Sequence, residues 1–154
     1  APDTTLEELL SENFRTERVD GYKCERCSRR GCDRSTYIAR SPNVLVVYID
    51  RRQDSSRYGK INRSVRFPQS LDLSKHQANP SPSGSYSLYG VLVHKDVNRS
   101  TNFGHYVAYV RDKFRAWHLL DDARVSPVNW DRVQEQHASL LFYAADKVQL
   151  PMER

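Results

Sequence analysis

The sequence predicts an α+β domain in which β-strands dominate and pair mostly antiparallel. Three observations support this fold class. A continuous β-branched run occupies 44–49, two apolar strand patterns follow one another closely at 104–110 and 117–121, and only two short segments have helical spacing. The length of 154 residues is enough for one domain or for the larger part of one.

The first predicted element is a helix that begins after Thr5 and ends near Asn13. Thr5 can cap the helix backbone, and Glu8, three residues later, can bond back to Thr5, which is the capping-box pattern. The apolar residues that share one helical face are Leu6, Leu9, Leu10 and Phe14. A tight, charged turn rich in cysteine and arginine follows at 21–27.

Strands are predicted through most of the remaining chain, at 36–40, 44–49, 65–68, 71–73, 86–94, 104–110, 117–121 and 138–144. The uninterrupted run at 44–49 is typical of a strand that is covered on both faces. Polar segments with proline or glycine separate the strands. Ser126, Pro127 and Asn129 introduce a second short helix, predicted over 130–136.

The composition argues against nucleic acid and membranes as partners. The chain has a formal net charge of +5, but its arginines are scattered, so they indicate solvated faces and make a nucleic-acid site unlikely. No apolar run is long enough to span a bilayer and no secretion signal opens the chain, so we expect no membrane partner. The three cysteines fall between 24 and 32, a pattern that fits a reducing compartment or a metal site better than a disulfide framework.

His105 is the candidate for acid–base chemistry. It follows Gly104 at the start of one strand, and Asp121 and Asp122 end the next strand, 16 and 17 residues later. In an antiparallel hairpin the two ends meet, so a carboxylate can accept the Nδ1 proton and leave Nε2 as a base. Adjacent strand residues point to opposite faces, so only one of the acids can face the ring directly. The alternatives are a histidine satisfied in the core and two solvated acids in a turn.

Cys24 and Cys27 have the spacing of half a zinc site, because two cysteines separated by two residues usually supply two of four ligands. Cys32 is a third ligand or a bystander, and nothing else in the chain completes a tetrahedron. A nucleophilic role is disfavoured for all three thiols, because catalytic cysteines usually sit at a helix N-terminus.

Four motifs occur in an order that resembles one protease family. They are Tyr86–His94, Gly104–Val110, Trp117–Val125 and Ala138–Tyr143. Together with Cys24–Cys27 and Phe67–Leu73 they resemble the C-terminal half of a ubiquitin-specific protease domain, over nearly the whole chain. The resemblance implies a papain-like hand: a fingers remnant at about 19–40, a palm at about 41–145, and a tail at 146–154.

The resemblance also implies a function. His105 matches the general base of the family, Asp121 the third triad member and Asp122 the polar residue that assists, while Gly104 and Tyr106 border the ubiquitin tail. Cys24 and Cys27 match the second of two zinc-binding pairs. Implied partners are ubiquitin, a ubiquitinated protein substrate and a thumb lobe that carries the cysteine nucleophile, because the family's Cys box has no match here. The implied location is the cytoplasm, the nucleus or both.

Two other functions remain open at this stage. A non-catalytic ubiquitin-binding or scaffold module would keep the same fold, although the intact His105 and Asp121 argue against it. A basic nucleic-acid-binding domain is the third reading, and strong salt-dependent binding would indicate it. We expect the chain alone to lack hydrolase activity.

Overall fold

The computed structural model describes residues 4–51, 64–79, 84–96 and 104–148. In chain order the elements of the first half are β1 (Thr4–Thr5), α1 (Leu6–Asn13), β2 (Glu17–Lys23), β3 (Arg30–Arg34), β4 (Val44–Tyr48), β5 (Val65–Arg66), β6 (Ser70–Asp72) and the 3₁₀ helix η1 (Ser74–His76). Those of the second half are β7 (Ser85–Asp96), β8 (Gly104–Arg111), β9 (Trp117–Asp121), β10 (Arg124–Val128), α2 (Trp130–Gln134) and β11 (Ala138–Ala145).

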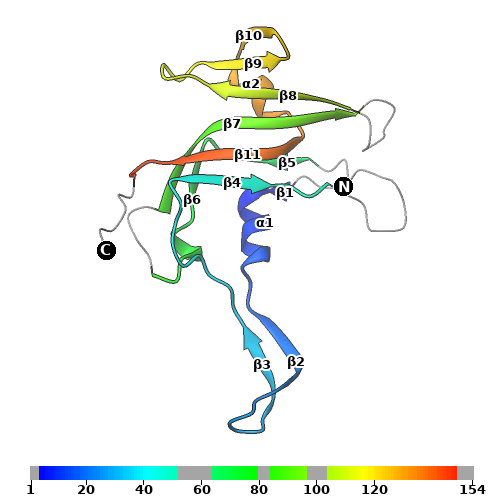
Figure 1. Ribbon diagram of the computed structural model, residues 1–154, viewed down its shortest axis with the longest axis vertical. Helices are drawn as coiled ribbons and strands as arrows, with labels where there is room; N and C mark the ends of the chain where they lie inside the picture. The colour runs from blue at the N-terminus through cyan, green and yellow to red at the C-terminus, as the bar shows by residue number, and fades with distance from the viewer. Residues whose placement is uncertain (1–3, 52–63, 80–83, 97–103, 149–154) are drawn as a thin grey trace.

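A seven-stranded sheet organises the fold, and the predicted β-dominated α+β class is confirmed (Figure 1). The strand order is β10-β9-β8-β7-β11-β4, and β6 pairs with the first residues of β7. Every pair in this sheet is antiparallel. The long strand β7 is central, because it pairs with β11 on one side and with β6 and β8 on the other.

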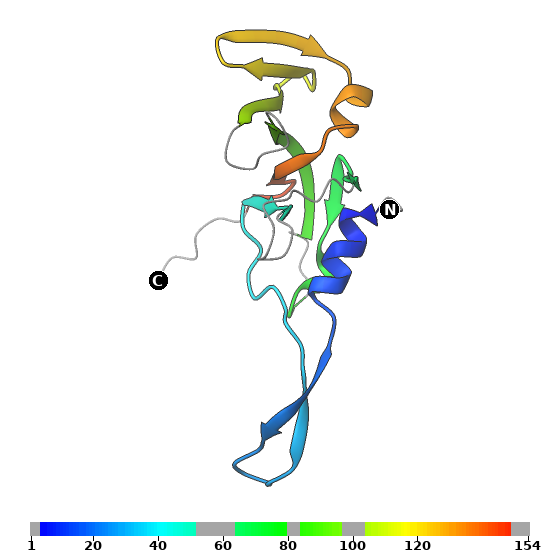
Figure 2. The ribbon, with the colours of Figure 1, turned by 90° about the vertical axis from the view of Figure 1, so that its right-hand side faces the viewer.

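The core lies on one face of this sheet, and Figure 2 shows α1 and α2 on the same side. Two buried tyrosines illustrate how polar groups in the core are satisfied. The Tyr86 hydroxyl donates to the Pro42 carbonyl at 2.7 Å, and the Tyr143 hydroxyl donates to the Pro68 carbonyl at 2.8 Å. Their rings therefore contribute apolar area without leaving an unpaired hydroxyl.

The helix α1 begins where the sequence predicts. Thr5 accepts from the Glu8 backbone N–H at 3.2 Å, and the Glu8 carboxylate accepts from the Thr5 N–H at 2.9 Å, so the capping box is confirmed. Leu6 packs into the core at 2% exposure. None of the helices in the described ranges has the length and apolar character needed to cross a membrane.

The hairpin β2–β3 projects away from the main sheet and carries the cysteines (Figure 1). Cys24 and Cys27 lie in the turn between the two strands, and Cys32 lies in β3, paired with Val19 of β2. The turn was predicted, but the strands on either side were not, because most of their residues are charged or exposed and show no apolar alternation.

Three strand predictions need correction. The strand at 44–49 exists as β4, but it pairs only with β11 in the described part, and Val44, Val46 and Tyr48 are 52%, 50% and 59% exposed, so it is not covered on both faces. The segment 36–40 has no strand partner beyond a single bridge between Ile38 and Gln77. Ser126 and Pro127, which were predicted to introduce the second helix, instead belong to the edge strand β10, where a proline is tolerated.

Candidate active site

The hairpin β8–β9 brings His105 and Asp121 together. Leu120 pairs with Ala108, so the register continued by one residue sets Asp121 beside Val107. His105 and Val107 share a face because side chains alternate along a strand. His105 and Asp121 are therefore diagonal neighbours on the core face, at the end of the sheet where the core stops.

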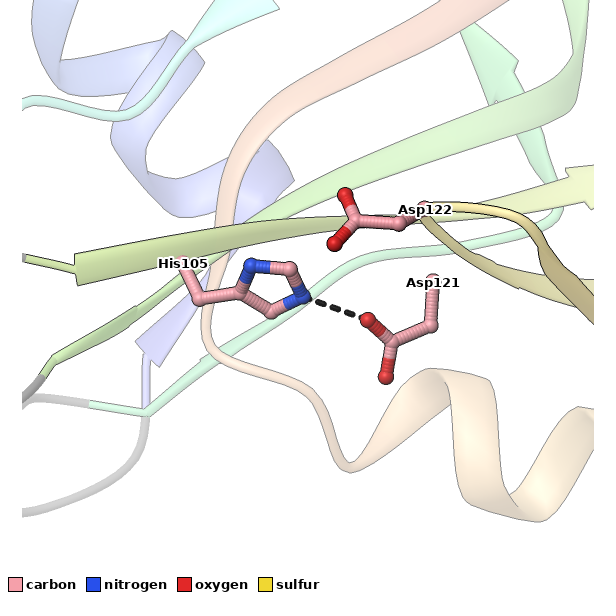
Figure 3. Close-up of side chains that lie close together, drawn as sticks. All are labelled: His105, Asp121 and Asp122. Atoms are coloured by element: carbon pink, nitrogen blue, oxygen red, sulfur yellow. Dashed lines mark hydrogen bonds and ion pairs between the residues drawn. The ribbon is translucent and has the colours of Figure 1, made fainter.

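The His105 imidazole is hydrogen-bonded to Asp121, as the hairpin argument predicted (Figure 3). The bond joins Nε2 to the Asp121 Oδ1, which reverses the predicted roles of the two ring nitrogens. The diagonal placement explains the reversal, because only the outer edge of the ring reaches across to Asp121. With Nε2 donating, Nδ1 carries the lone pair. Both side chains are 40% exposed, so the ring is open to an incoming group.

Asp122 joins this pair through the backbone of the β9–β10 turn. Its φ of 51° lies in the left-handed region, which aspartate tolerates better than most residues. One ligand atom from each of His105, Asp121 and Asp122 lies within 4.8 Å of the others. The expectation that one acid bonds the ring directly is confirmed, and the turn adds the second carboxylate nearby.

These contacts shift both titrations. The hydrogen bond to Asp121 raises the pKa of His105 above its ordinary value of 6.5, and the charges of Asp121 and Asp122 raise it further. The same bond lowers the pKa of Asp121 below 3.8. The His105 contribution to stability is therefore complete below pH 6.5 and is lost as pH rises through the folded-state pKa, whereas the Asp121 contribution is lost as pH falls below 3.8.

Replacing Asp121 by asparagine is expected to lower the pKa of His105 towards 6.5, because both the charge-assisted bond and the adjacent charge are lost. Asp122→Asn removes only a more distant charge and should lower the pKa less. NMR titration of the imidazole resonances measures both shifts. A larger effect from Asp122→Asn would contradict the assignment of Asp121 as the bonded acid.

Gly104 lies under the ring of a second histidine that sequence reasoning did not single out. His94 of β7 pairs with Tyr106, and the two ring centroids are 4.6 Å apart. A Cβ on Gly104 would meet the His94 imidazole and would lie 2.7 Å from the Lys95 carbonyl oxygen. Tyr106 is 57% exposed and faces the side of the sheet opposite to His105. The glycine is thus required for close approach between β7 and β8.

Gly104→Ala is expected to displace the end of β8 and with it His105. The His94 side chain can rotate away, but the Lys95 carbonyl belongs to the strand backbone. Overpacking of this kind costs about 1–3 kcal/mol, measurable as a lower melting temperature. Gly21→Ala is the matched control, because its Cβ would have nothing within 4 Å. Equal melting temperatures for the two variants would contradict the close approach.

His118, the nearest rival to His105, has a different acid. Its Nε2 lies 3.0 Å from the Asp112 Oδ2. Asp112 also accepts from the backbone N–H groups of Phe114 and Ala116, at 2.8 and 2.9 Å. This carboxylate therefore fixes the β8–β9 turn, which identifies His118 as a structural residue. The sequence signal was a turn aspartate six residues before the histidine.

Zinc binding by Cys24 and Cys27 stays a prediction. Backbone N–H groups of Cys27 and Arg26 lower the pKa of Cys24, which favours the thiolate that binds metals. Within residues 4–51, 64–79, 84–96 and 104–148, however, the sole group of three or more potential ligands is the His105 cluster. Cys24 and Cys27 thus fit half of a four-ligand site, and Cys32 does not complete it.

Comparisons with known proteins identify the family of this chain. The family model of ubiquitin carboxyl-terminal hydrolases matches residues 2–143. Ubiquitin carboxyl-terminal hydrolase 16 of Arabidopsis thaliana is 38% identical over 146 residues, which cover 92% of this chain and 14% of the relative. Ubiquitin carboxyl-terminal hydrolase 17-like protein C of Mus musculus is 32% identical over 139 residues, which cover 89% of this chain and 24% of the relative.

Solved structures of a deubiquitinase module have a similar fold. A structure of the yeast SAGA DUB module matches with a TM-score of 0.82 at 26% identity, covering 95% of this chain and 34% of that one. The SAGA DUB module bound to monoubiquitin matches with a TM-score of 0.81 at 26% identity and the same coverage. The chain therefore spans about a third of these structures and belongs to the ubiquitin carboxyl-terminal hydrolase family.

Proposed function

We propose that this chain is the C-terminal part of a thiol-dependent deubiquitinase, to which it supplies the general base and the acid of a Cys-His-Asp triad. The observation that carries the proposal is the exposed His105–Asp121 pair at the end of the β8–β9 hairpin. Family membership supplies the reaction class, because its members are deubiquitinating cysteine proteases. The nucleophile comes from an N-terminal lobe of the complete protein or from a separate chain.

In the first half of the reaction, Nδ1 of His105 takes the proton of the cysteine thiol. The thiolate attacks the carbonyl carbon of the C-terminal glycine of ubiquitin. As the carbon–nitrogen bond breaks, the imidazolium gives its proton to the leaving amine, and a thioester remains. Asp121 holds the ring through Nε2 and stabilises the imidazolium, so the raised pKa of His105 favours the charged pair.

In the second half, water replaces the amine. Nδ1 takes a proton from the attacking water, the carbon–sulfur bond breaks, and that proton returns to the thiolate. Asp122 adds negative charge near the imidazolium without bonding it directly. The ubiquitin tail passes Gly104, which is exposed. The exposed Tyr106 ring would contact the tail from the side of the sheet opposite to His105.

Ubiquitin and a ubiquitinated protein are the proposed partners. One structural neighbour is the SAGA DUB module bound to monoubiquitin, and that likeness supports ubiquitin as a ligand of the complete protein here. Cys24 and Cys27 would hold zinc together with two ligands from outside this chain, and the metal would stabilise the turn of the β2–β3 hairpin. Elemental analysis of the complete protein measures its zinc content. The proposed location is the cytoplasm or the nucleus.

Cleavage of a ubiquitin–fluorophore conjugate tests the proposal. The complete protein is expected to release the fluorophore. This chain alone is expected to be inactive, because its three cysteines lie in the β2–β3 hairpin, away from β8 and His105 (Figure 1). Release by the chain alone that His105→Ala abolishes would overturn the division of the triad between two parts. Ubiquitin binding without cleavage by the complete protein would instead establish a non-catalytic ubiquitin-binding or scaffold module.

A further inference from the structure

A polar hollow lies at the other end of strand β8 from the catalytic pair. It has a volume of about 490 Å³ and is lined by Gln69, Ser70, Ser87, Arg111, Arg115 and Asp146. Arg111 lies six positions along β8 from His105, which corresponds to roughly 20 Å along an extended strand. The hollow is therefore distinct from the site at His105.

Two arginines meet in this hollow. Arg111 is half-buried, and its guanidinium carbon lies 6.0 Å from the centre of the buried Trp117 ring. Burial lowers the pKa of Arg111, and the positive charge of Arg115 lowers it further, while Asp146 opposes both effects. Two like charges held together in partly desolvated surroundings attract an anion.

Most of the donor side chains in the hollow make no bond within the part of the chain that the structure describes. Throughout the described ranges, the side chains of Gln69, Ser70, Arg111 and Arg115 make no hydrogen bond or ion pair with one another or with other residues. Each guanidinium has five N–H donors, and the amide and hydroxyl add others. By contrast, Asp146 is engaged, because it accepts from the Ser87 hydroxyl at 2.6 Å and its backbone N–H bonds Ser85 at 3.0 Å.

The backbone conformation of Arg115 supports a binding role for the hollow. Its φ of 71° lies in the left-handed region, which glycine adopts freely and which is strained for other residues. The conformation places an exposed arginine at the rim of the hollow, although glycine would make the turn without strain. Strain of this kind clusters at binding sites.

We propose that the hollow is an exosite for an acidic segment of a protein partner, with one carboxylate side chain entering between Arg111 and Arg115. Two arginines against Asp146 leave one uncompensated positive charge, which matches a single carboxylate. The planar guanidinium forks suit bidentate bonding to its two oxygens. The volume and the polar lining from Gln69 and Ser70 leave room for the neighbouring peptide atoms.

Peptide binding to this chain tests the exosite without relying on catalysis. The probe is a blocked hexapeptide with two central glutamates, and its counterpart carries glutamines at the same places. Isothermal titration gives affinities, and tryptophan fluorescence reports on Arg111 beside Trp117. The glutamate peptide is expected to bind at least about tenfold more tightly, because hydrogen bonds to charged groups are stronger than those between neutral groups.

Arg115→Gln is expected to weaken binding of the glutamate peptide about tenfold. Lys113→Gln is the matched control, because Lys113 is exposed in the same turn but does not line the hollow; it should change affinity less than about twofold. Equal losses from the two variants would reduce the effect to net charge and overturn the site. Tighter binding of a phosphoserine peptide, or equal binding of free acetate, would overturn the assignment to a carboxylate on a protein segment.

Discussion

His105→Gln in the complete protein is expected to lower kcat/KM for ubiquitin–fluorophore cleavage by about a thousandfold. Glutamine keeps a polar side chain of similar reach, but it cannot take the thiol proton or return it to the leaving amine. The cysteine would then attack only as the small fraction of thiolate present without a base. Binding of ubiquitin should change little, because the tail contacts proposed for Gly104 and Tyr106 remain.

His118→Gln provides the matched control for this result. His118 lies on the same hairpin and also bonds an aspartate, at 3.0 Å, but that aspartate fixes a turn. Its replacement is expected to leave kcat/KM within about threefold and to cost at most about 1 kcal/mol of stability. Similar losses of activity in the two variants would contradict the assignment of the base to His105.

The contact between His105 and Asp121 was predictable because its geometry is local. His105 and the acids belong to one hairpin, so a glycine-led strand, a short turn and an apolar strand ending in acids predict that one of the two acids faces the ring. The choice of Asp121 over Asp122 came from the family resemblance. The bonded ring nitrogen was not predictable from that reasoning, because it depends on a diagonal offset of two residues, and sequence spacing does not give the register to that accuracy.

Features built from segments that are distant in the sequence were also missed, because only the tertiary fold brings those segments together. The hollow at Arg111 gathers side chains from β6 and the residue before it, from β7, from the end of β8, from the β8–β9 turn and from the residue after β11. Sequence alone treated the scattered arginines as solvated surface. Arg51 shows the same limit, because it is 6% exposed and donates to the Ala138 carbonyl at 2.8 Å across 87 residues. Charge and hydropathy patterns report local structure, whereas burial of an arginine is decided by the tertiary fold.

The strand β4 exposes apolar side chains on one face of the sheet. Alternating residues of a β-branched run are usually hidden, but Val44, Val46 and Tyr48 lie on the sheet face away from α1 and α2. Apolar surface of this kind marks an interaction site or an aggregation risk. The two faces of the sheet therefore differ sharply in what they contribute to stability, and substitutions in neighbouring strands can measure that difference.

Leu141→Ala is expected to destabilise the fold by about 2–5 kcal/mol. Leu141 is fully buried in β11, where it pairs with Val91 of β7 and Val47 of β4, so the truncation leaves a cavity in the strand that joins the centre of the sheet to its edge. Such a loss is a large share of the 5–15 kcal/mol that typically stabilises a domain. Urea denaturation should show a lower midpoint with an unchanged slope.

Val46→Ala on the neighbouring strand is the matched control. Val46 is 50% exposed on the opposite face of the sheet, so little apolar area returns to water and no cavity forms. The expected loss is under about 1 kcal/mol, and most of it reflects the weaker strand preference of alanine. If the two variants lost equal stability, the Val46 face would have to be as buried as the Leu141 face, and the assignment of a single core to the α1 and α2 side of the sheet would fail.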